Sequence, residues 1–150
     1  MKTVVIQVNK QDVYDEVSKT TAYTGKKAEA EGAFARAFAT EVDQTEMFER
    51  FWNEGKINLV GAIKQHVTSE NEDNNSDYKV TLSLSNRYDD NITTSLNQSA
   101  FTFFVLTICA KWFGLYDHEE RDRYVVEANA YLEDIKRKVL YKTKPTRPTY

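Results

Sequence analysis

The sequence contains one cysteine, two prolines, five glycines and two histidines in 150 residues. The single cysteine, Cys109, excludes an internal disulfide framework and fits a reducing compartment or a protein that needs no cross-link. Neither a C-x-x-C nor an H-x-x-x-H spacing occurs, so a zinc site would have to draw heavily on carboxylates. No G-x-x-x-x-G-K-[ST] or G-x-G-x-x-G is present either, which leaves a glycine-rich phosphate loop unsupported.

The remaining candidates for chemistry have simpler structural explanations. Asp73, Asn75 and Asp77 have the opening spacing of a calcium loop, but Tyr78 stands where that loop needs glycine and Leu84 where it needs glutamate. The residues before Asn9 contain one base, Lys2, and a short apolar stretch, which predicts no secretory signal. We therefore expect no cofactor, no metal and no small-molecule substrate.

Catalytic side chains are equally sparse. Cys109 falls in an apolar run, where a thiol is normally inert packing, and His66 and His118 suit structural roles. Asp89 and Asp90 could be a general acid and base, but helix capping explains them with fewer assumptions. We predict that the protein is not an enzyme.

What the sequence does contain is ordinary for one globular domain. Hydrophobic residues make up 41% and charged residues 29%, and the formal net charge of −3 gives no overall attraction to nucleic acid or anionic lipid. The charge is uneven, because Glu70–Asp77 holds four acids and no base, whereas Lys136–Tyr150 holds six bases and no acid. A basic tail suggests an acidic partner surface, and the alternative is a solvated, frayed terminus.

The densest apolar stretch, Ile92 to Phe113, predicts the central helix of the fold. Asp89 and its neighbours supply N-terminal caps, and Gly114 is a favourable C′ glycine. Its most apolar run, Ala100 to Phe113, is short and is interrupted by Lys111, which favours a buried helix over a membrane span. The competing interpretation is a strand over Phe101 to Ile108, because that part is rich in β-branched and aromatic residues.

Four further helices are predicted around this one. Asn9 caps a helix that closes at Thr20, Thr21 and Gly25, with a turn at Gly25. An alanine-rich helix covers Lys26 to Thr40. Capping boxes begin the other two helices, at Asp43/Glu46 running to about Val67, and at Asp117/Glu120 running to about Tyr141. The last helix should direct Val125, Ala128, Leu132, Ile135 and Val139 inward.

Two strands complete the expected domain. Thr3 to Val8 is β-branched, and Tyr78 to Tyr88 alternates apolar with polar residues, so the two should pair. Ser69 to Asp77 is almost wholly polar and predicts an exposed loop. The expected fold is mainly helical α+β: residues 1–141 form one domain of about five helices with a two-stranded sheet, and residues 142–150 form an extended basic arm. Two strands alone are marginal, so helices or another subunit should cover or extend the sheet.

Aromatic and basic residues interleave in the tail, which suits either a single-strand nucleic-acid surface or an arm docked on another protein. The first interpretation predicts steeply salt-dependent binding to generic DNA or RNA. The second predicts a tail that orders only in an assembly. The candidate interface residues are Tyr141, Lys142, Lys144, Pro145, Arg147, Pro148, Tyr150, Lys79 and Arg87.

Several framework motifs along the chain resemble one family. They are VYDEVSKTTAYTG, MFERFWNE, RYDDN, KWF and the terminal LEDIKRKVLYKTKPTRPTY. They resemble small proteins encoded in the structural gene clusters of tailed phages and prophages of gut Bacteroidetes. The resemblance implies a minor virion component, made in the bacterial host cytoplasm, of the head-to-tail connector, adaptor or tail-completion type.

Such adaptors are similar in being small helical subunits in rings whose terminal arms reach neighbours. The implied partners are further copies of the chain, portal or tail components, and packaged DNA through non-specific charge, with no membrane. The alternative from another class is a cytoplasmic regulatory or nucleic-acid-binding helical protein.

Overall fold

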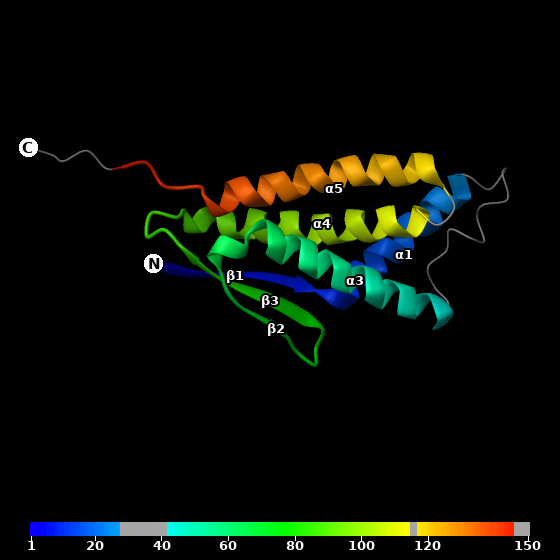
Figure 1. The fold of residues 1–150 in the computed structure, drawn as a ribbon, viewed down its shortest axis with the longest axis horizontal. Helices are drawn as coiled ribbons and strands as arrows, with labels where there is room; N and C mark the ends of the chain where they lie inside the picture. Colours follow the sequence, from blue (N-terminus) through cyan, green and yellow to red (C-terminus); the bar gives the residue numbers. More distant parts are fainter. Residues whose placement is uncertain (28–41, 115–116, 146–150) are drawn as a thin grey trace, which may run out of the picture.

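A computed structural model describes residues 1–27, 42–114 and 117–145. Within these ranges, helices cover one face of a small antiparallel sheet (Figure 1). The order is β1 (Lys2–Asn9), α1 (Lys10–Lys27), α3 (Val42–Ala62), β2 (Val67–Glu72), β3 (Asp77–Leu84), α4 (Thr93–Phe113) and α5 (His118–Val139). The mainly helical α+β class is confirmed. The described residues contain four α-helices and three strands, so the expected five and two differ in detail.

The predicted pairing of the first strand with Tyr78 to Tyr88 is confirmed. β1 and β3 are antiparallel with Lys2 opposite Leu84, and the alternate residues of β3 from Tyr78 to Leu84 are buried. The strand ends at Leu84, four residues earlier than expected. Tyr88 is also buried, but it lies beyond a turn and makes only an isolated bridge with Lys142.

The exposed loop predicted over Ser69 to Asp77 is wrong in its first half. Val67–Glu72 is the edge strand β2, paired with β3, so the sheet has the order β1-β3-β2. The carboxylate of Asp73 accepts hydrogen bonds from the backbone N–H groups of Asn75 (2.9 Å) and Asp77 (3.0 Å), which closes the turn. After Val67 every β2 residue is exposed, so the sequence of this strand does not alternate between apolar and polar residues.

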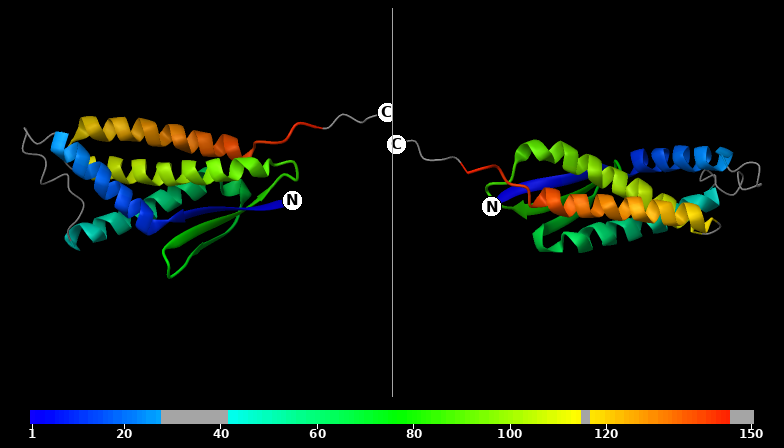
Figure 2. Two further views of the ribbon diagram at one scale, coloured as in Figure 1. Left: turned by 180° about the vertical axis from the view of Figure 1, so that it is seen from behind. Right: turned by 90° about the horizontal axis from the view of Figure 1, so that it is seen from above.

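The central position of Ile92 to Phe113 is confirmed, and it is a helix rather than a strand. β1, α1, α3 and α5 all contact α4, as Figure 2 shows from two further directions. The segment Asp90–Phe113 is long and apolar enough to cross a membrane by composition, but half of its apolar window is buried inside this fold. α4 is therefore the core helix on which the other elements pack.

The ends of α4 agree only in part with prediction. The Asp89 carboxylate accepts a hydrogen bond from the Asn91 N–H at 3.0 Å, and a single 3-10 turn precedes the helix. Gly114 has φ −59, so it is not a left-handed cap. Its N–H donates to the Ala110 carbonyl at 2.9 Å, and the Asp117 N–H donates to the Phe113 carbonyl at 2.7 Å. Gly114 and Asp117, on either side of the connection to α5, are thus both hydrogen-bonded to the last turn of α4.

The first two helices differ from expectation at their ends. The Asn9 side chain accepts from the Asp12 N–H at 3.0 Å, which confirms that cap. α1 then continues through Gly25 to Lys27, so the predicted turn is wrong; a helical glycine costs only about 1 kcal/mol. Most of the predicted helix over Lys26 to Thr40 lies outside the described residues. α3 begins at Val42, just before the expected cap Asp43, and ends at Ala62 rather than Val67.

The last helix starts as predicted, because the Asp117 carboxylate accepts from the Glu120 N–H at 3.3 Å. It ends at Val139, two residues before Tyr141. Val125 was expected inside but is 40% exposed, whereas Tyr124 is buried. The Tyr124 ring stacks on Phe113, with centroids 5.6 Å apart. This contact fixes the rotation of α5 about its own axis and turns Val125 toward the surface.

Three aromatic rings join the helical layer to the sheet. Trp52 of α3 lies against Phe104 of α4, with centroids 4.5 Å apart, and Tyr78 of β3 meets both rings edge-on. Gly55 makes this approach possible, because a Cβ there would lie 2.9 Å from Phe104 Cδ1. The close packing of α3 on α4 therefore depends on the missing side chain at position 55.

Candidate interaction site

The C-terminal arm is attached to its own domain through its first residues. The Tyr141 carbonyl accepts from the Asp89 N–H at 3.3 Å, and the Thr143 N–H donates to the Arg87 carbonyl at 2.8 Å. The Arg87 guanidinium returns a hydrogen bond to the Thr143 carbonyl at 2.8 Å. The expectation that the tail orders only in an assembly is therefore wrong for its first two residues, Lys142 and Thr143.

Beyond this attachment the described part of the arm is exposed. Tyr141 is 54% exposed, and Lys142, Lys144 and Pro145 are exposed as well. The arm leaves the body at the end of the molecule where the N-terminus also lies (Figure 1). The other three predicted arm residues, Arg147, Pro148 and Tyr150, lie outside the described residues.

The two remaining predicted interface residues are separated by the fold. Arg87 belongs to the arm attachment, as described above. Lys79 lies within β3, where it is opposite Gln7 of β1 and Asn71 of β2. Its neighbours along β3 point into the core, so Lys79 belongs to the outer face of the sheet. The structure thus brings Arg87, but not Lys79, to the arm.

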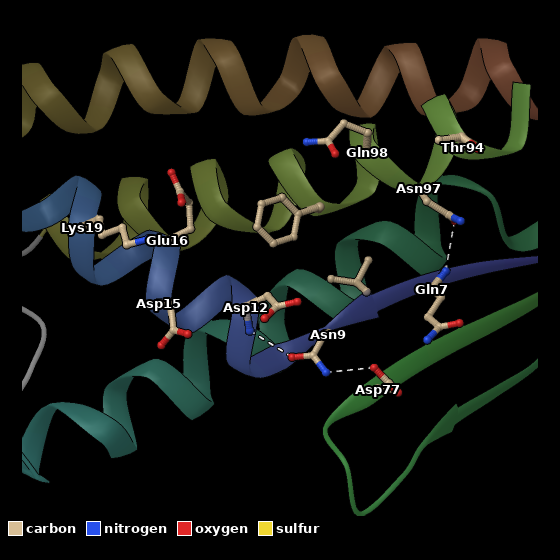
Figure 3. A pocket seen from close by; sticks show the side chains of 12 residues that line it. Gln7, Asn9, Asp12, Asp15, Glu16, Lys19, Asp77, Thr94, Asn97 and Gln98 are labelled. Atoms are coloured by element: carbon tan, nitrogen blue, oxygen red, sulfur yellow. Dashed lines mark hydrogen bonds between the residues drawn. The ribbon is translucent and has the colours of Figure 1, made fainter.

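A polar cleft of about 790 Å³ lies where β1 passes into α1, with α4 as its other wall (Figure 3). Asp12, Asp15 and Glu16 of α1 and Asp77 of β3 line it, with Lys19 as the single base among the lining residues. The sequence did not indicate this cleft, because its acids come from α1 and from a strand more than sixty residues later. Its excess of carboxylates favours a cationic partner.

The edge of β1 within this cleft is partly satisfied by α4. The Asn97 side-chain oxygen accepts from the Gln7 N–H at 3.1 Å, and the Asn9 amide donates to the Asp77 carboxylate at 2.9 Å. These two hydrogen bonds, drawn as dashed lines in Figure 3, therefore hold β1, α4 and β3 together. These contacts are structural, and they give the cleft a fixed shape.

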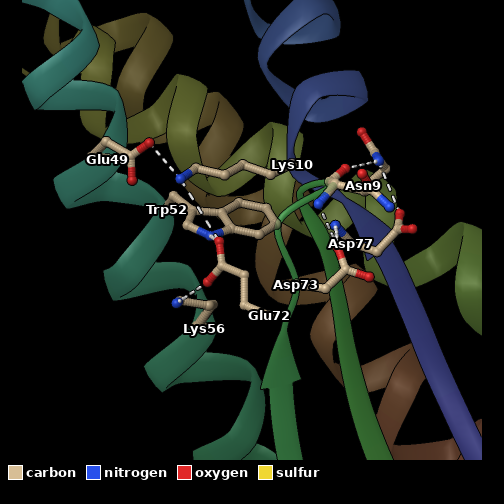
Figure 4. A network of polar contacts seen from close by, with 9 residues as sticks. Asn9, Lys10, Glu49, Trp52, Lys56, Glu72, Asp73 and Asp77 are labelled. Carbon is tan, nitrogen blue, oxygen red and sulfur yellow. Dashed lines mark hydrogen bonds and ion pairs between the residues drawn. The ribbon is translucent and has the colours of Figure 1, made fainter.

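A second group of polar contacts fastens β2 to α3 (Figure 4). The Glu72 carboxylate accepts from Lys56 Nζ at 2.7 Å and from Trp52 Nε1 at 3.3 Å. Lys10 Nζ lies 3.7 Å from Glu72 and also pairs with Glu49. Partial burial raises the pKa of Glu72, but the Lys56 hydrogen bond and the charges of Lys56 and Lys10 outweigh it and hold that pKa below its ordinary value.

Two other carboxylates have lowered pKa values. The hydrogen bond from Lys111 lowers the pKa of Glu54, with the two groups 2.8 Å apart. Burial raises the pKa of Asp134, but hydrogen bonds from Lys138 at 2.7 Å and Ser99 at 2.8 Å bring it below its ordinary value. In each case the folded protein favours the ionised carboxylate.

These shifts predict an acid-sensitive fold. Because the three carboxylates bind protons more weakly when folded, their stabilisation is complete above the unfolded pKa values of about 4 and is lost as pH falls through the lower folded values. Urea unfolding between pH 7 and pH 3 should therefore give a falling free energy of unfolding below about pH 4. The Glu72→Gln variant should show a smaller decrease over that range; a decrease equal to that of the unmodified chain would contradict this assignment.

An apolar groove of about 810 Å³ runs between α3 and α5 above α4. Ile57 and Gly61 form its α3 wall, Phe103 lies on its floor, and Val125 and Leu132 form its α5 wall. Lys111, Arg121 and Lys136 also line it, and the lining includes no acid. The sequence missed this groove because Val125 was predicted to face the core.

In the part of the chain that the structure describes, no His, Cys, Asp and Glu side chains form a group of three or more that could hold a metal ion. Cys109 is completely buried, and burial raises the pKa of its thiol, which opposes formation of a nucleophilic thiolate. His66 lies half-buried in a 3-10 turn, and His118 is exposed in the first turn of α5.

Comparisons with protein-family models, with curated proteins and with solved structures gave no match. The described residues present three candidate interaction surfaces: the anchored basic arm, the acidic cleft and the apolar groove.

Proposed function

We propose that the protein is a non-enzymatic structural subunit that assembles with its neighbours. By the motif resemblance, its place is a tailed-phage virion, as a connector, adaptor or tail-completion subunit in an oligomeric ring. The supporting observation is the arm: the Arg87–Thr143 pairing anchors its base, and Lys144 and Pro145 beyond that pairing are exposed. A segment anchored at its base and exposed beyond it is suited to reaching another subunit.

Charge supports the same proposal. The described arm carries Lys142 and Lys144, whereas the acidic cleft carries three carboxylates on α1 and one on β3. The two surfaces are distinct, so a contact between them in different copies would be head-to-tail and could close into a ring. The same arm could instead bind an acidic surface of a portal or tail protein, or packaged DNA by non-specific charge.

Deletion of residues 144–150 is expected to weaken assembly without unfolding the subunit. The hydrogen bonds between Arg87 and Thr143 are retained in this variant, so its thermal unfolding should match that of the full chain. Light scattering should report a lower average mass than for the full chain at equal concentration. A charge-preserving control, Lys144→Arg, should assemble as the full chain does. Normal assembly of the deletion variant would refute the role of the arm.

Nucleic-acid binding is the second candidate, favoured by exposed Tyr141 beside Lys142 and Lys144. Stacking on an aromatic ring combined with cationic backbone contacts is a common mode of single-strand binding. A gel shift at moderate salt with a steep salt dependence would support this candidate. Mass-spectrometric detection of the chain in purified virions would support the structural role, and its absence there would favour a regulatory protein.

A further inference from the structure

We propose that the groove between α3 and α5 is an interface between two copies of this chain. In this arrangement α5 of one copy lies antiparallel to α5 of the other, across a two-fold axis at Asn129. The inference does not rest on the proposed function, since such a dimer could form whether or not the protein belongs to a virion. Its evidence is the placement of apolar and charged side chains on one face.

Exposed apolar side chains gather at this groove. Ile57 is 71% exposed, Val125 is 40% exposed and the adjacent Val126 is 69% exposed. Ile57 and Val125 belong to opposite walls, and half-buried Leu132 extends the α5 wall. Single exposed valines are ordinary, but large apolar side chains grouped along a groove are typical of a protein contact.

The small residues of the groove make room for a helix. Gly61 and Ala62 of α3, Ala110 of α4 and Ala128 of α5 all line it. A Cβ added at Gly61 would meet no atom within 4 Å, so the α3 wall is open at that point. A helix of another chain can approach such a surface closely and place its apolar side chains between the walls.

Charge indicates which helix would fit. The groove presents Arg121 and Lys136, besides Lys111 that is paired with Glu54, whereas the neighbouring outer ridge of α5 presents Asp122 and Glu133. Their side chains are 69% and 65% exposed, and Val126 lies between them along the helix. One chain therefore offers both a cationic apolar groove and an acidic ridge with an apolar centre. Complementary surfaces of this kind favour a second copy over an unrelated partner.

The spacing along α5 is self-complementary. Asp122, Val126, Asn129, Glu133 and Lys136 follow at intervals of three and four residues, so they share one flank of the helix. Asp122 and Lys136 lie about two helical turns on either side of Asn129. Antiparallel pairing about Asn129 therefore sets Asp122 of each copy opposite Lys136 of the other. The same pairing sets Val126 against the Leu132 wall of the facing groove.

The ion pairs within one copy do not prevent Asp122 and Lys136 from pairing with the other copy. Arg121 lies 3.0 Å from Asp122, and Lys136 lies 2.9 Å from Glu133. These side chains are between 39% and 69% exposed, and ion pairs with such exposure stabilise a fold very little. Pairing across the two-fold axis replaces them and also removes Val126 from water.

The first test is the mass of the full chain in solution. Light scattering after size exclusion should give at least twice the 17.4 kDa of one chain. Val126→Glu should weaken the self-association by about tenfold or more. The control is Glu127→Gln, an exposed position on the opposite flank of α5, and it should leave the mass unchanged. A mass of one chain for the unmodified protein would overturn the proposal.

A charge exchange and a cross-link test the register. Lys136→Glu should weaken the dimer, and adding Asp122→Lys should restore it. Because the only natural cysteine is buried, an Asn129→Cys variant can be joined to its partner by a short bifunctional maleimide, whereas Glu127→Cys should not be joined. No restoration by the double variant, or equal cross-linking at both positions, would refute the antiparallel pairing. Deletion of residues 144–150 should leave this dimer intact. A failure of the dimer proposal can therefore be distinguished from a failure of the proposed role of the arm.

Discussion

Replacement of Phe104 by alanine is expected to lower the free energy of unfolding by about 3–5 kcal/mol. Phe104 is 0% exposed and contacts the rings of Trp52, Tyr78 and Phe103. Its removal deletes the contact at which α3, α4 and β3 meet, and the surrounding helices cannot close the space fully. Urea unfolding followed by circular dichroism measures the loss.

The matched control is Phe101→Ala on the same helix. Phe101 is half-buried and lines the acidic cleft, where water can replace part of the lost side chain. We expect it to cost less than half of the Phe104 effect, because the penalty depends on burial and on the cavity left behind. Equal losses at the two positions would contradict the assignment of Phe104 to the centre of the core.

Trp52→Ala is expected to have the second large effect, also about 3–5 kcal/mol. Trp52 is 0% exposed, packs on Phe104 and donates to Glu72 through Nε1. The alanine variant loses the ring and the hydrogen bond, so the attachment of β2 to α3 should weaken as well. Hydrogen exchange of the β2 amides should then become faster, alongside the loss measured in urea.

Trp52→Phe separates the two contributions. A phenylalanine keeps most of the packing against Phe104 but cannot donate to Glu72, and the loss of that hydrogen bond should cost about 1 kcal/mol. Because phenylalanine is smaller than tryptophan, the cavity that it leaves adds to this cost. The total should still stay well below that of Trp52→Ala. If the phenylalanine variant were as unstable as the alanine variant, the hydrogen bond rather than the packing would dominate.

The sequence was sufficient for the elements that carry a strong pattern. α4 is apolar around most of its circumference, Asp89 caps the 3-10 turn that leads into it, and β3 alternates from Tyr78 to Leu84. Both patterns arise because these elements are buried, and burial is visible directly in the composition and spacing of apolar residues. β2 was missed because its residues after Val67 are exposed, and only its backbone pairing with β3 makes it a strand.

The candidate surfaces were harder to predict, because they depend on contacts between distant parts of the chain. The rotation of α5 is set by Tyr124 on Phe113, and this decides whether Val125 faces the core or the groove. The arm is attached by the Arg87 guanidinium and by backbone groups of Arg87 and Asp89, and backbone contacts leave no signal in the residue types. For a helical residue such as Val125, periodicity alone predicts the direction of the side chain only to within one neighbouring position around the helix.

The fold separates stability from the surfaces proposed for assembly. Substitutions in the aromatic core should unfold the subunit and abolish association together. Val126 is exposed and the deletion of residues 144–150 begins at exposed Lys144, so each change should alter association while leaving unfolding in urea nearly unchanged. This contrast distinguishes a loss of interface from a loss of fold.

The most direct test of self-association through the α3–α5 face is native mass spectrometry of the full chain beside its Val126→Glu variant. The unmodified protein should have a mass of two or more copies of the 17.4 kDa chain, and the variant should have a smaller one. A single-chain mass for the unmodified protein, or the same multiple for both proteins, would contradict it.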